Sequence, residues 1–396
     1  MSAVRASATT PDVAVIGGGI VGTAAASFLA AAGARVRLYE RTEIAAGASG
    51  RNSGIVQHPF DPVLAGLYRA TLAAYRSLAD GADGFELPNE PAGLLYVGRD
   101  GALAERDAAD WAATWPDSRP EVLAGAALTR LEPALAPDLI ACRLAIGYPV
   151  EPAAATHAFA AVARARGVEI VVADGAPEVV ARRAAGVRVV DRVEPAGTVL
   201  VAAGPWTPSL VEPGGSWRPI RAVWGVVAGL ALSGAPTHGL EAIDITIEPG
   251  VAVDPLGEPV EPSDSQVEFS LVPAGGASSL GSTFLSSEPD PPAWLAALRR
   301  VGARYVPAVA EAPLVGLRHC ARPVSADGRP LLGAVEGIDG LFVAAGHGPW
   351  GISTGPGSAR LVADLILGRI GRGNLPTALD PNRFGPVQRQ DSASSR

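Results

Sequence analysis

The alternation of hydrophobic and polar positions is clearest near the start of the chain. The apolar run from Asp12 to Ile16 is typical of a short, buried strand of a parallel sheet. A glycine-rich turn follows, and the alanine-rich stretch from Val21 to Ala32 predicts a buried helix, with Gly33 placed to end it. A second strand is expected at residues 35–39. The chain thus predicts a strand, a turn, a helix and a strand in close succession.

The turn carries the glycine spacing G-x-G-x-x-G at Gly17, Gly19 and Gly22. In such a turn the first glycine permits the tight bend, the second lets the backbone approach a pyrophosphate, and the third lets helix and strand pack closely. Glu40 lies 18 residues after Gly22, at the end of the second strand, where it can accept hydrogen bonds from ribose hydroxyls. An acid there argues against a 2′-phosphate, so NAD or FAD is favoured over NADP; the glycines do not separate the first two.

The next segment, residues 45–54, consists almost wholly of small residues. Such a loop can pack against a flat ring or a phosphate, with Ser49, Arg51 and Asn52 as hydrogen-bond donors. A surface loop without a ligand is the alternative interpretation. A helix is expected after it, at residues 62–79.

The middle of the chain predicts a second layer of structure. A helix at residues 153–166 and strands at 168–172 and 198–202 continue the first unit. The segments 221–232, 241–247, 266–272 and 278–284 alternate as strands of an antiparallel sheet, closed by a helix at 291–305. Trp224, Tyr96 and Phe269 line a pocket or fill the core, and Trp206, which follows the strand at 198–202, contacts the cofactor or packs in the core.

Near the C-terminus, a buried strand runs from Gly340 into the glycine-rich turn Gly346-His-Gly-Pro-Trp-Gly351. We expect a helix from Gly357 to Leu367, since proline is favoured at a first helical position and Pro356 precedes this stretch. The free backbone N–H groups of the turn and the helix dipole would suit a developing negative charge.

Composition narrows the class of protein. Of 396 residues, 48% are hydrophobic and 18% charged, which predicts a globular chain of two or three domains. The net charge is −8 and no basic cluster is present, so a nucleic-acid partner is not expected. The chain has no lysine, which excludes both a pyridoxal-phosphate Schiff base and a P-loop. Its two cysteines, Cys142 and Cys320, lie far apart and form no disulfide framework.

Two further absences shape the expectations. No pair of histidines has metal-ligand spacing, so we predict no metal; His157 and His238 are expected on the surface.

Residues 13–34 carry no charge and are long enough to cross a bilayer, but consecutive glycines disfavour a regular helix there. With no targeting segment evident, we expect no stable membrane insertion and a cytoplasmic location.

These motifs resemble the D-amino-acid oxidase/glycine oxidase/sarcosine oxidase superfamily of FAD-dependent enzymes. The stretches GGGIVGTAAASFLAAAGARVRLYER and GASGRNSGIV carry the resemblance at the N-terminus. At the C-terminus the family pattern R-P-x-x-x-D-G-x-P-x-x-G … G-H-G-x-x-G … P is matched from Arg322 to Pro356. The resemblance extends from Asp12 to about Gly368.

The resemblance implies an α/β fold: a Rossmann-like FAD-binding domain of the GR2 type with an inserted α+β substrate domain built on an antiparallel sheet. We expect the FAD-binding domain at residues 12–84, 150–220 and 318–370, the substrate domain at 85–149 and 221–317, and disordered tails at 1–11 and 382–396. The expected FAD-contacting residues come from the glycine turn, the small-residue loop, the third strand segment and the C-terminal turn: Gly17, Gly19, Ile20, Gly22, Glu40, Arg41, Ser49, Arg51, Asn52, Ser53, Gly54, Ala203, Gly204, Trp206, Cys320, Gly346, His347, Gly348, Gly351 and Ile352.

Four residues receive individual roles. Arg322 matches the glycine-oxidase-type arginine that pairs with the amino-acid carboxylate; a structural arginine bonded to loop carbonyls is the alternative. Cys320 lies seven residues before Asp327, where a cysteine of monomeric sarcosine oxidases binds FAD covalently; otherwise it is a packing residue, and non-covalent FAD is expected. His347 is expected to contact the flavin or stabilise its turn, and His58 to enter the active site.

The implied reaction is oxidation of a small amino acid or a secondary or N-methyl amine by hydride transfer to flavin N5, with hydrolysis of the resulting imine. Oxygen or an electron-transfer acceptor then reoxidises the flavin. The lysine that promotes reaction with oxygen in the sarcosine-oxidase branch is absent here. A 2-hydroxy-acid dehydrogenase, a flavoprotein subunit of a heteromeric amine or proline dehydrogenase, and a flavin-binding scaffold without turnover are the alternatives. No side chain stands out in the sequence as a catalytic base.

Overall fold

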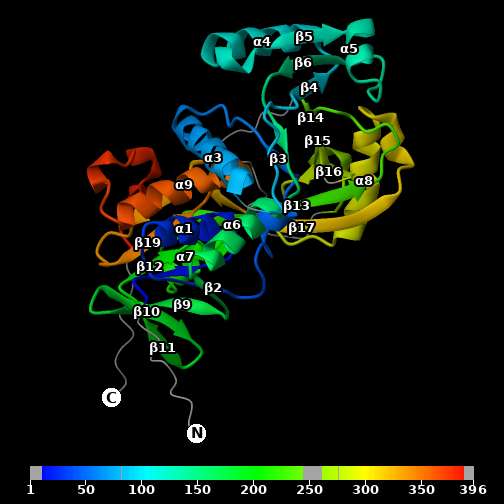
Figure 1. Ribbon diagram of the computed structural model, residues 1–396. Coiled ribbons are helices and arrows are strands. Elements are labelled where there is room, and N and C mark those ends of the chain that lie inside the picture. Colours follow the sequence, from blue (N-terminus) through cyan, green and yellow to red (C-terminus); the bar gives the residue numbers. More distant parts are fainter. Residues whose placement is uncertain (1–10, 82, 244–260, 275, 388–396) are drawn as a thin grey trace.

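The computed structural model describes residues 11–81, 83–243, 261–274 and 276–387. Within them the chain forms a six-stranded sheet, an eight-stranded sheet and two smaller sheets. Figure 1 shows the six-stranded sheet with its helices in one half of the molecule and the eight-stranded sheet in the other. The protein is thus a mixed α/β protein, as the sequence predicted.

The six-stranded sheet has the order β18-β19-β12-β1-β2-β8. Its neighbouring strands are parallel, except that β18 is antiparallel to β19. The central strand β1 therefore has parallel neighbours on both sides, as the unbroken apolar run predicted. The strands are β1 (Val13–Ile16), β2 (Val36–Glu40), β8 (Glu169–Val172), β12 (Thr198–Val201), β18 (Leu331–Ala334) and β19 (Leu341–Ala345).

Both faces of this sheet are covered. Val13 and Val15 face a core shared with four helices, whereas Ala14 and Ile16 face a second core on the other side. The helices are α1 (Ile20–Ala31), α3 (Pro62–Gly81), α6 (Ala154–Ala165) and α9 (Gly351–Ile366). The opposite face packs against α7 (Thr207–Val211) and the small sheet of β9 (Gly175–Val180), β10 (Arg183–Val189) and β11 (Arg192–Pro195).

The eight-stranded sheet has the order β17-β13-β16-β15-β14-β4-β6-β5 and is antiparallel apart from the pair β14–β4. One face packs on α8 (Pro291–Ala303) around Phe269, Leu280 and Trp294. The strands are β4 (Leu94–Gly98), β5 (Glu121–Ala124), β6 (Ile140–Leu144), β13 (Ile220–Leu230), β14 (Gly239–Ala242), β15 (Val267–Ala274), β16 (Ala277–Thr283) and β17 (Leu314–Ser325). The remaining elements are α2 (Ala48–Arg51), α4 (Gly101–Thr114), α5 (Gly125–Leu131), and the paired strands β3 (Ile55–Val56) and β7 (Tyr148–Pro149).

Most predicted elements lie within two or three residues of the observed ones, but the C-terminal helix does not. Helix α9 begins at Gly351, so Pro356 lies inside the helix rather than at its first position. A proline within a helix cannot donate to the carbonyl four residues earlier, here that of Ile352. The buried hydroxyl of Tyr75 donates to this carbonyl instead, at 2.8 Å. A side chain of α3 thus compensates for the proline in a helix that starts six residues earlier than the sequence indicated.

Two other expectations were wrong. His238 is buried rather than on the surface, with its Nδ1 2.6 Å from a carboxylate oxygen of buried Glu132. Residues 382–387, predicted to belong to a disordered tail, are partly held in place: Arg383 forms an ion pair with Asp327 at 2.8 Å, and Val387 is buried. The expected tail 1–11 and the end of the expected strand 241–247 lie largely outside the described residues.

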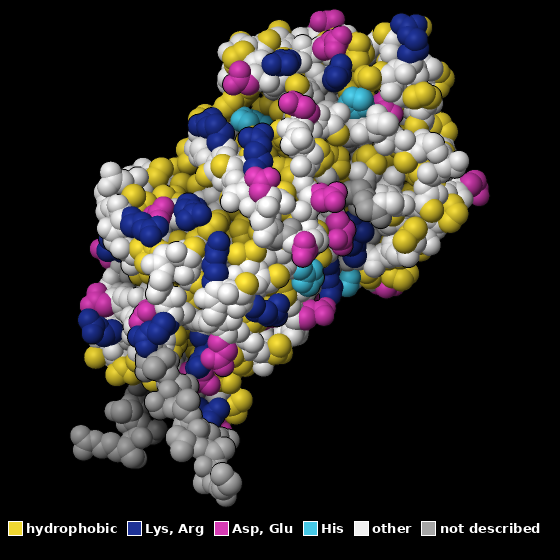
Figure 2. Space-filling model, in the orientation of Figure 1, with side chains coloured by type: hydrophobic (Ala, Val, Ile, Leu, Met, Phe, Trp, Pro, Cys, Tyr) yellow, Lys and Arg dark blue, Asp and Glu magenta, His cyan; other side chains and the backbone are white. Residues whose placement is uncertain are grey.

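The surface shows no gathering of one charge on the face drawn in Figure 2, where basic and acidic side chains are interspersed. Among the described residues, no helix is long and apolar enough to cross a membrane. The uncharged stretch at residues 13–34 instead forms β1 and α1 of the six-stranded sheet.

Candidate active site

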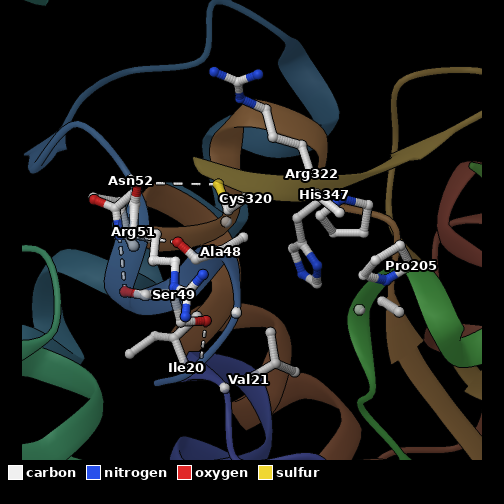
Figure 3. Close-up of a pocket in the computed structure, with 18 of the residues that line it drawn as sticks. Ile20, Val21, Ala48, Ser49, Arg51, Asn52, Pro205, Cys320, Arg322 and His347 are labelled. Atoms are coloured by element: carbon white, nitrogen blue, oxygen red, sulfur yellow. Dashed lines mark hydrogen bonds between the residues drawn. The ribbon is translucent and has the colours of Figure 1, made fainter. Parts of the chain in front are cut away.

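A pocket of about 650 Å³ lies between the two large sheets. One wall is formed by the glycine turn after β1, the segment around α2 and the turn before α9; the other is formed by strands of the eight-stranded sheet. Three segments far apart in the sequence, represented by Ser49, Pro205 and His347, meet around it in Figure 3. The pocket thus lies where the carboxyl ends of parallel strands face the antiparallel sheet, a usual place for a ligand in such folds.

The glycine turn is close-packed backbone. Gly17 has φ +114°, and a Cβ there would lie 2.8 Å from the carbonyl carbon of Ala202. A Cβ on Gly22 would overlap with the carbonyl oxygen of Gly17, so this glycine lets α1 pack on the turn, as predicted. No acidic residue occupies the first turn of α1. The positive end of the helix dipole therefore faces the pocket without a negative side chain of its own.

Two side chains brace this turn. The backbone N–H of Ile20 donates to Ser49 Oγ at 2.9 Å, and the N–H of Gly18 donates to Glu40 Oε2 at 2.7 Å. Asn52 donates to the carbonyl of Ser49 at 2.8 Å and so holds the small-residue segment in shape. The segment predicted as a loop contains the short helix α2 and lines the pocket, so it is not a free surface loop.

The turn before α9 brings His347 into the pocket. Its ring is 3% exposed, and Nε2 is buried without a hydrogen-bond partner among the described residues. Burial lowers the pKa of His347 to about 4, so the ring is neutral at pH 7. In Figure 3 the ring reaches between the segments of Cys320 and Pro205. A neutral imidazole with an unused nitrogen here is suited to bond a ligand.

Arg322 lies on β17 and reaches across β13 to β16. It passes over Gly225, where a Cβ would lie only 2.5 Å from Cζ of Arg322. The guanidinium donates to the carbonyl of Thr283 at 2.8 Å and to the hydroxyl of Ser282, and its Cζ lies 4.3 Å from the ring centre of Phe284. Burial lowers the pKa of Arg322. Because a guanidinium has five N–H donors, it retains donors beyond those two bonds.

The polar lining residues that were not predicted include Gln57, Glu241 and Glu268. Gln57 Nε2 donates to Glu241 Oε1 at 3.0 Å, and Glu241 also interacts with the Tyr96 hydroxyl. Burial raises the pKa of both carboxyl groups, and for Glu268 the nearby Arg322 opposes this while Glu241 adds to it. The only available sequence signal was an acid within each predicted strand, and an acid there is ordinarily on the solvent side.

Cys320 lines the pocket and is buried, with its sulfur 4.0 Å from the carbonyl oxygen of Arg51. Burial raises the pKa of the Cys320 thiol, although Arg322, Arg51 and Arg318 oppose this. The same burial favours the thiol over the reactive thiolate. Cys142 is also a free, buried cysteine.

The structure brings most of the predicted site together. The pocket lining includes Arg322 and the predicted cofactor residues Gly17, Gly19, Ile20, Glu40, Arg41, Ser49, Arg51, Asn52, Ser53, Gly54, Ala203, Gly204, Trp206, Cys320, His347, Gly348, Gly351 and Ile352. Gly22 and Gly346 lie outside the lining and shape its turns. Trp206 is 43% exposed and lies under the Arg41 guanidinium, 4.8 Å from the ring centre, so it is not a core residue. Trp224 and Phe269 reach the lining, whereas Tyr96 does not.

His58 is the exception among the predicted catalytic residues. It lies outside the pocket lining, and its Nδ1 accepts a hydrogen bond from the backbone N–H of Phe60 at 3.1 Å. Its ring packs edge-on against Phe60, Tyr68 and Trp115, at 5.0, 5.2 and 4.6 Å between ring centres. In this structure His58 therefore belongs to an aromatic cluster beside the pocket and not to its lining, and a role for it in the active site stays a prediction.

These features fit a dinucleotide cofactor with a flat ring system. The glycine turn lines the pocket at the start of α1, where a helix N-terminus favours a pyrophosphate. Helix α9 also begins at the pocket. The unpartnered Nε2 of His347 calls for a ligand atom beside it. A Rossmann-like unit that faces a largely antiparallel sheet across this pocket is the arrangement expected of a flavin-dependent oxidoreductase.

Comparisons with known proteins identify the family. The model of the FAD dependent oxidoreductase family (DAO) matches residues 12–365, and the chain belongs to this family of FAD-binding flavoproteins. It is 25% identical to glycine oxidase of Bacillus licheniformis over 375 residues, 90% of this chain and 93% of that one. It is 36% identical to glycine oxidase of Pseudomonas aeruginosa over 92 residues, 23% of this chain and 24% of the relative, so the match spans about a quarter of that protein. The structure of glycine oxidase from Bacillus cereus superposes with a TM-score of 0.76 at 24% identity, covering 91% of this chain and 96% of that one.

Proposed function

We propose that the protein oxidises a small amino acid or a secondary or N-methyl amine, such as glycine, a D-amino acid or a sarcosine-like compound. The observation that carries this proposal is the half-buried guanidinium of Arg322 in the pocket wall, which retains N–H donors after its bonds to Ser282 and Thr283. A planar guanidinium can hold a carboxylate by two parallel hydrogen bonds. The similarity to glycine oxidases supports an amino-acid substrate.

Each wall of the pocket would have its own task. FAD, when bound, supplies the acceptor for a hydride from the substrate carbon, and the imine product hydrolyses in water. Ile20, Ser49 and the glycine turn would hold its pyrophosphate, and His347 would bond its ring system. Arg322 would fix the substrate carboxylate and so orient the reacting C–H bond. The eight-stranded sheet would exclude water from that side.

The same division supports two discontinuous domains. We assign residues 12–84, 150–220 and 318–370 to the FAD-binding domain and 85–149 and 221–317 to the substrate domain. All strands of the six-stranded sheet come from the first set. Strand β17 crosses the boundary at residues 317 and 318, and this continuity would place Arg322 between the cofactor and the substrate.

The test is Arg322→Ala in the purified flavoprotein. We expect the variant to keep its flavin and to lose about 10²–10³-fold in kcat/KM for amino acids, because two charge-assisted hydrogen bonds are lost. Anaerobic bleaching of the flavin by a panel of amines and amino acids measures this. Arg322→Lys keeps the charge but not the paired donors and should recover part of the loss. Unchanged KM and turnover in Arg322→Ala would exclude the assignment.

The same preparation tests the attachment of FAD. We expect non-covalent FAD, since the Cys320 thiol is buried and its pKa is raised. Acid precipitation should then release the yellow colour into the supernatant. Colour that stays in the pellet of the wild type and leaves it in Cys320→Ser would show a covalent link through Cys320.

A 2-hydroxy-acid dehydrogenase is the second candidate, because the neutral, unpartnered His347 imidazole can accept the proton of a hydroxyl group. Bleaching by 2-hydroxy acids but not by amines would favour it. Oxygen consumption compared with dye reduction distinguishes an oxidase from a dehydrogenase that serves another acceptor or a partner subunit. We place the reaction in the cytoplasm.

A further inference from the structure

Several hydrogen-bond acceptors lie together in the part of the pocket lined by β14 and β15. Glu241 of β14 pairs in register with Ser270 of β15, and Glu241, Glu268 and Ser270 all line the pocket, so both carboxylates border the same space. Glu268 has no ion-pair or hydrogen-bond partner among the described residues, and Arg322 influences it only at longer range. One guanidinium therefore faces two carboxylates across the pocket.

Gln57 supplies an independent observation. Its side chain is 7% exposed and lines the pocket, and its Nε2 donates to Glu241. This bond fixes the amide orientation, because Oε1 turned toward Glu241 would place two acceptors together. Oε1 is consequently buried without a hydrogen-bond partner among the described residues. A buried acceptor without a donor carries a free-energy cost that a ligand N–H group would remove.

We propose that Glu268, Gln57 Oε1 and Glu241 form a subsite for a second cationic group of the substrate, so that the enzyme prefers basic amino acids to neutral amino acids. This inference rests on the proposed amine oxidation. With the substrate carboxylate on Arg322, an ammonium or guanidinium group at the other end meets three acceptors. Glu268 makes the direct contact because its carboxylate is free; Glu241 is already engaged by Gln57 and Tyr96 and is a positioning residue.

The balance of charges in the pocket also favours a substrate with a second positive group. A zwitterion of zero net charge leaves the two half-buried carboxylates opposed by Arg322 alone. A substrate with one additional positive charge balances them. Since an uncompensated charge that is partly removed from water is costly, the site discriminates against neutral side chains.

The experiment compares lysine with norleucine, in both enantiomers, as reductants of the flavin in the anaerobic holoenzyme. These compounds share a carbon chain and differ in the terminal ammonium. We expect the second-order rate constant of flavin reduction to be at least about tenfold higher for lysine, and this ratio to fall toward one in Glu268→Gln. Equal rates for the two compounds in the wild type, or a Glu268→Gln variant that slows both by the same factor, would overturn the inference.

A binding measurement separates this inference from the proposed reaction. 4-Guanidinobutyrate carries a carboxylate and a cation but no oxidisable α-amine, and hexanoate lacks the cation. Calorimetric titration of the holoenzyme should show 4-guanidinobutyrate binding at least about tenfold more tightly, with the ratio lost in Glu268→Gln. If no amine bleaches the flavin while this preference holds, the proposed oxidation is wrong and the cation subsite stands. If amines bleach the flavin and the preference is absent, only the subsite is wrong. If Glu268→Gln does not fold, the inference is tested by the wild type alone, through the lysine-to-norleucine rate ratio and the 4-guanidinobutyrate-to-hexanoate affinity ratio.

Discussion

The two walls of the pocket are built from different materials. The wall on the six-stranded sheet consists mainly of backbone, and within each of its segments the glycines, helix starts and N–H groups lie close together along the chain. The wall on the eight-stranded sheet is made of side chains, with Arg322, Glu268 and Glu241 contributed by three strands. Backbone can be shaped only by glycine and small residues, so the first wall is specified locally and suits an invariant cofactor. Side chains can be exchanged singly, so the second wall is where substrate preference is set.

The largest effect is expected where the backbone wall has no spare volume. In Gly22→Ala the new methyl group would overlap with the carbonyl oxygen of Gly17, which cannot move without opening the turn. We expect loss of about 2–3 kcal/mol of stability and purified protein with less than about a tenth of the normal flavin content. Flavin absorbance per chain and thermal unfolding measure both quantities.

Gly66→Ala is the matched control for this change. It adds the same methyl group to an exposed position of α3, where nothing lies within 4 Å. Because alanine favours a helix over glycine, the control should keep its flavin and gain about 0.5–1 kcal/mol of stability. Normal flavin content in Gly22→Ala would show that the turn tolerates more than the geometry allows.

The difference between a wall made of backbone and a wall made of side chains also explains what could be predicted from the sequence. The βαβ unit and its cofactor class were predictable because the glycine spacing and the apolar periodicity are local. The start of α9 was not, since the hydroxyl that compensates for Pro356 belongs to Tyr75, far away in the chain. Glu241 and Glu268 were not predicted as site residues, because the polar face of a strand is normally exposed to solvent. Only the tertiary structure shows that this face is covered by the other half of the molecule.

The next effect concerns the side-chain wall. Gly225→Ala places a methyl group where the guanidinium of Arg322 crosses β13, and the flexible side chain must move aside. We expect the variant to fold and keep its flavin, while KM for carboxylate-bearing substrates rises about 10-fold or more because the paired donors are displaced. Gly229→Ala, on the same strand with only ordinary contacts at 3.5 Å or more, is the control and should not change KM. An unchanged KM in both variants would mean that Arg322 does not bind the carboxylate from this position.

The smallest effect concerns the aromatic cluster that joins the two halves: His58, Phe60 and Tyr68 with Trp111 and Trp115. Burial lowers the pKa of His58 to about 4, with a smaller contribution from Arg69. Between pH 6.5, the ordinary pKa of a histidine, and pH 4, the lowered pKa of His58, the folded protein therefore binds fewer protons at this site than the unfolded chain. Stability from this residue is complete above that window and is lost as the pH falls through it.

His58→Asn tests this coupling, because asparagine can still accept the bond from the Phe60 N–H without titrating. Between pH 7.5 and pH 5 the wild type should lose about 1–2 kcal/mol more stability than the variant, measured by urea unfolding with tryptophan fluorescence. His157→Asn, at an exposed position of α6, should follow the wild type at both pH values. If His58→Asn also follows the wild type, protonation of His58 does not loosen the cluster. The acid sensitivity of the protein would then lie within one of the two halves rather than where they meet.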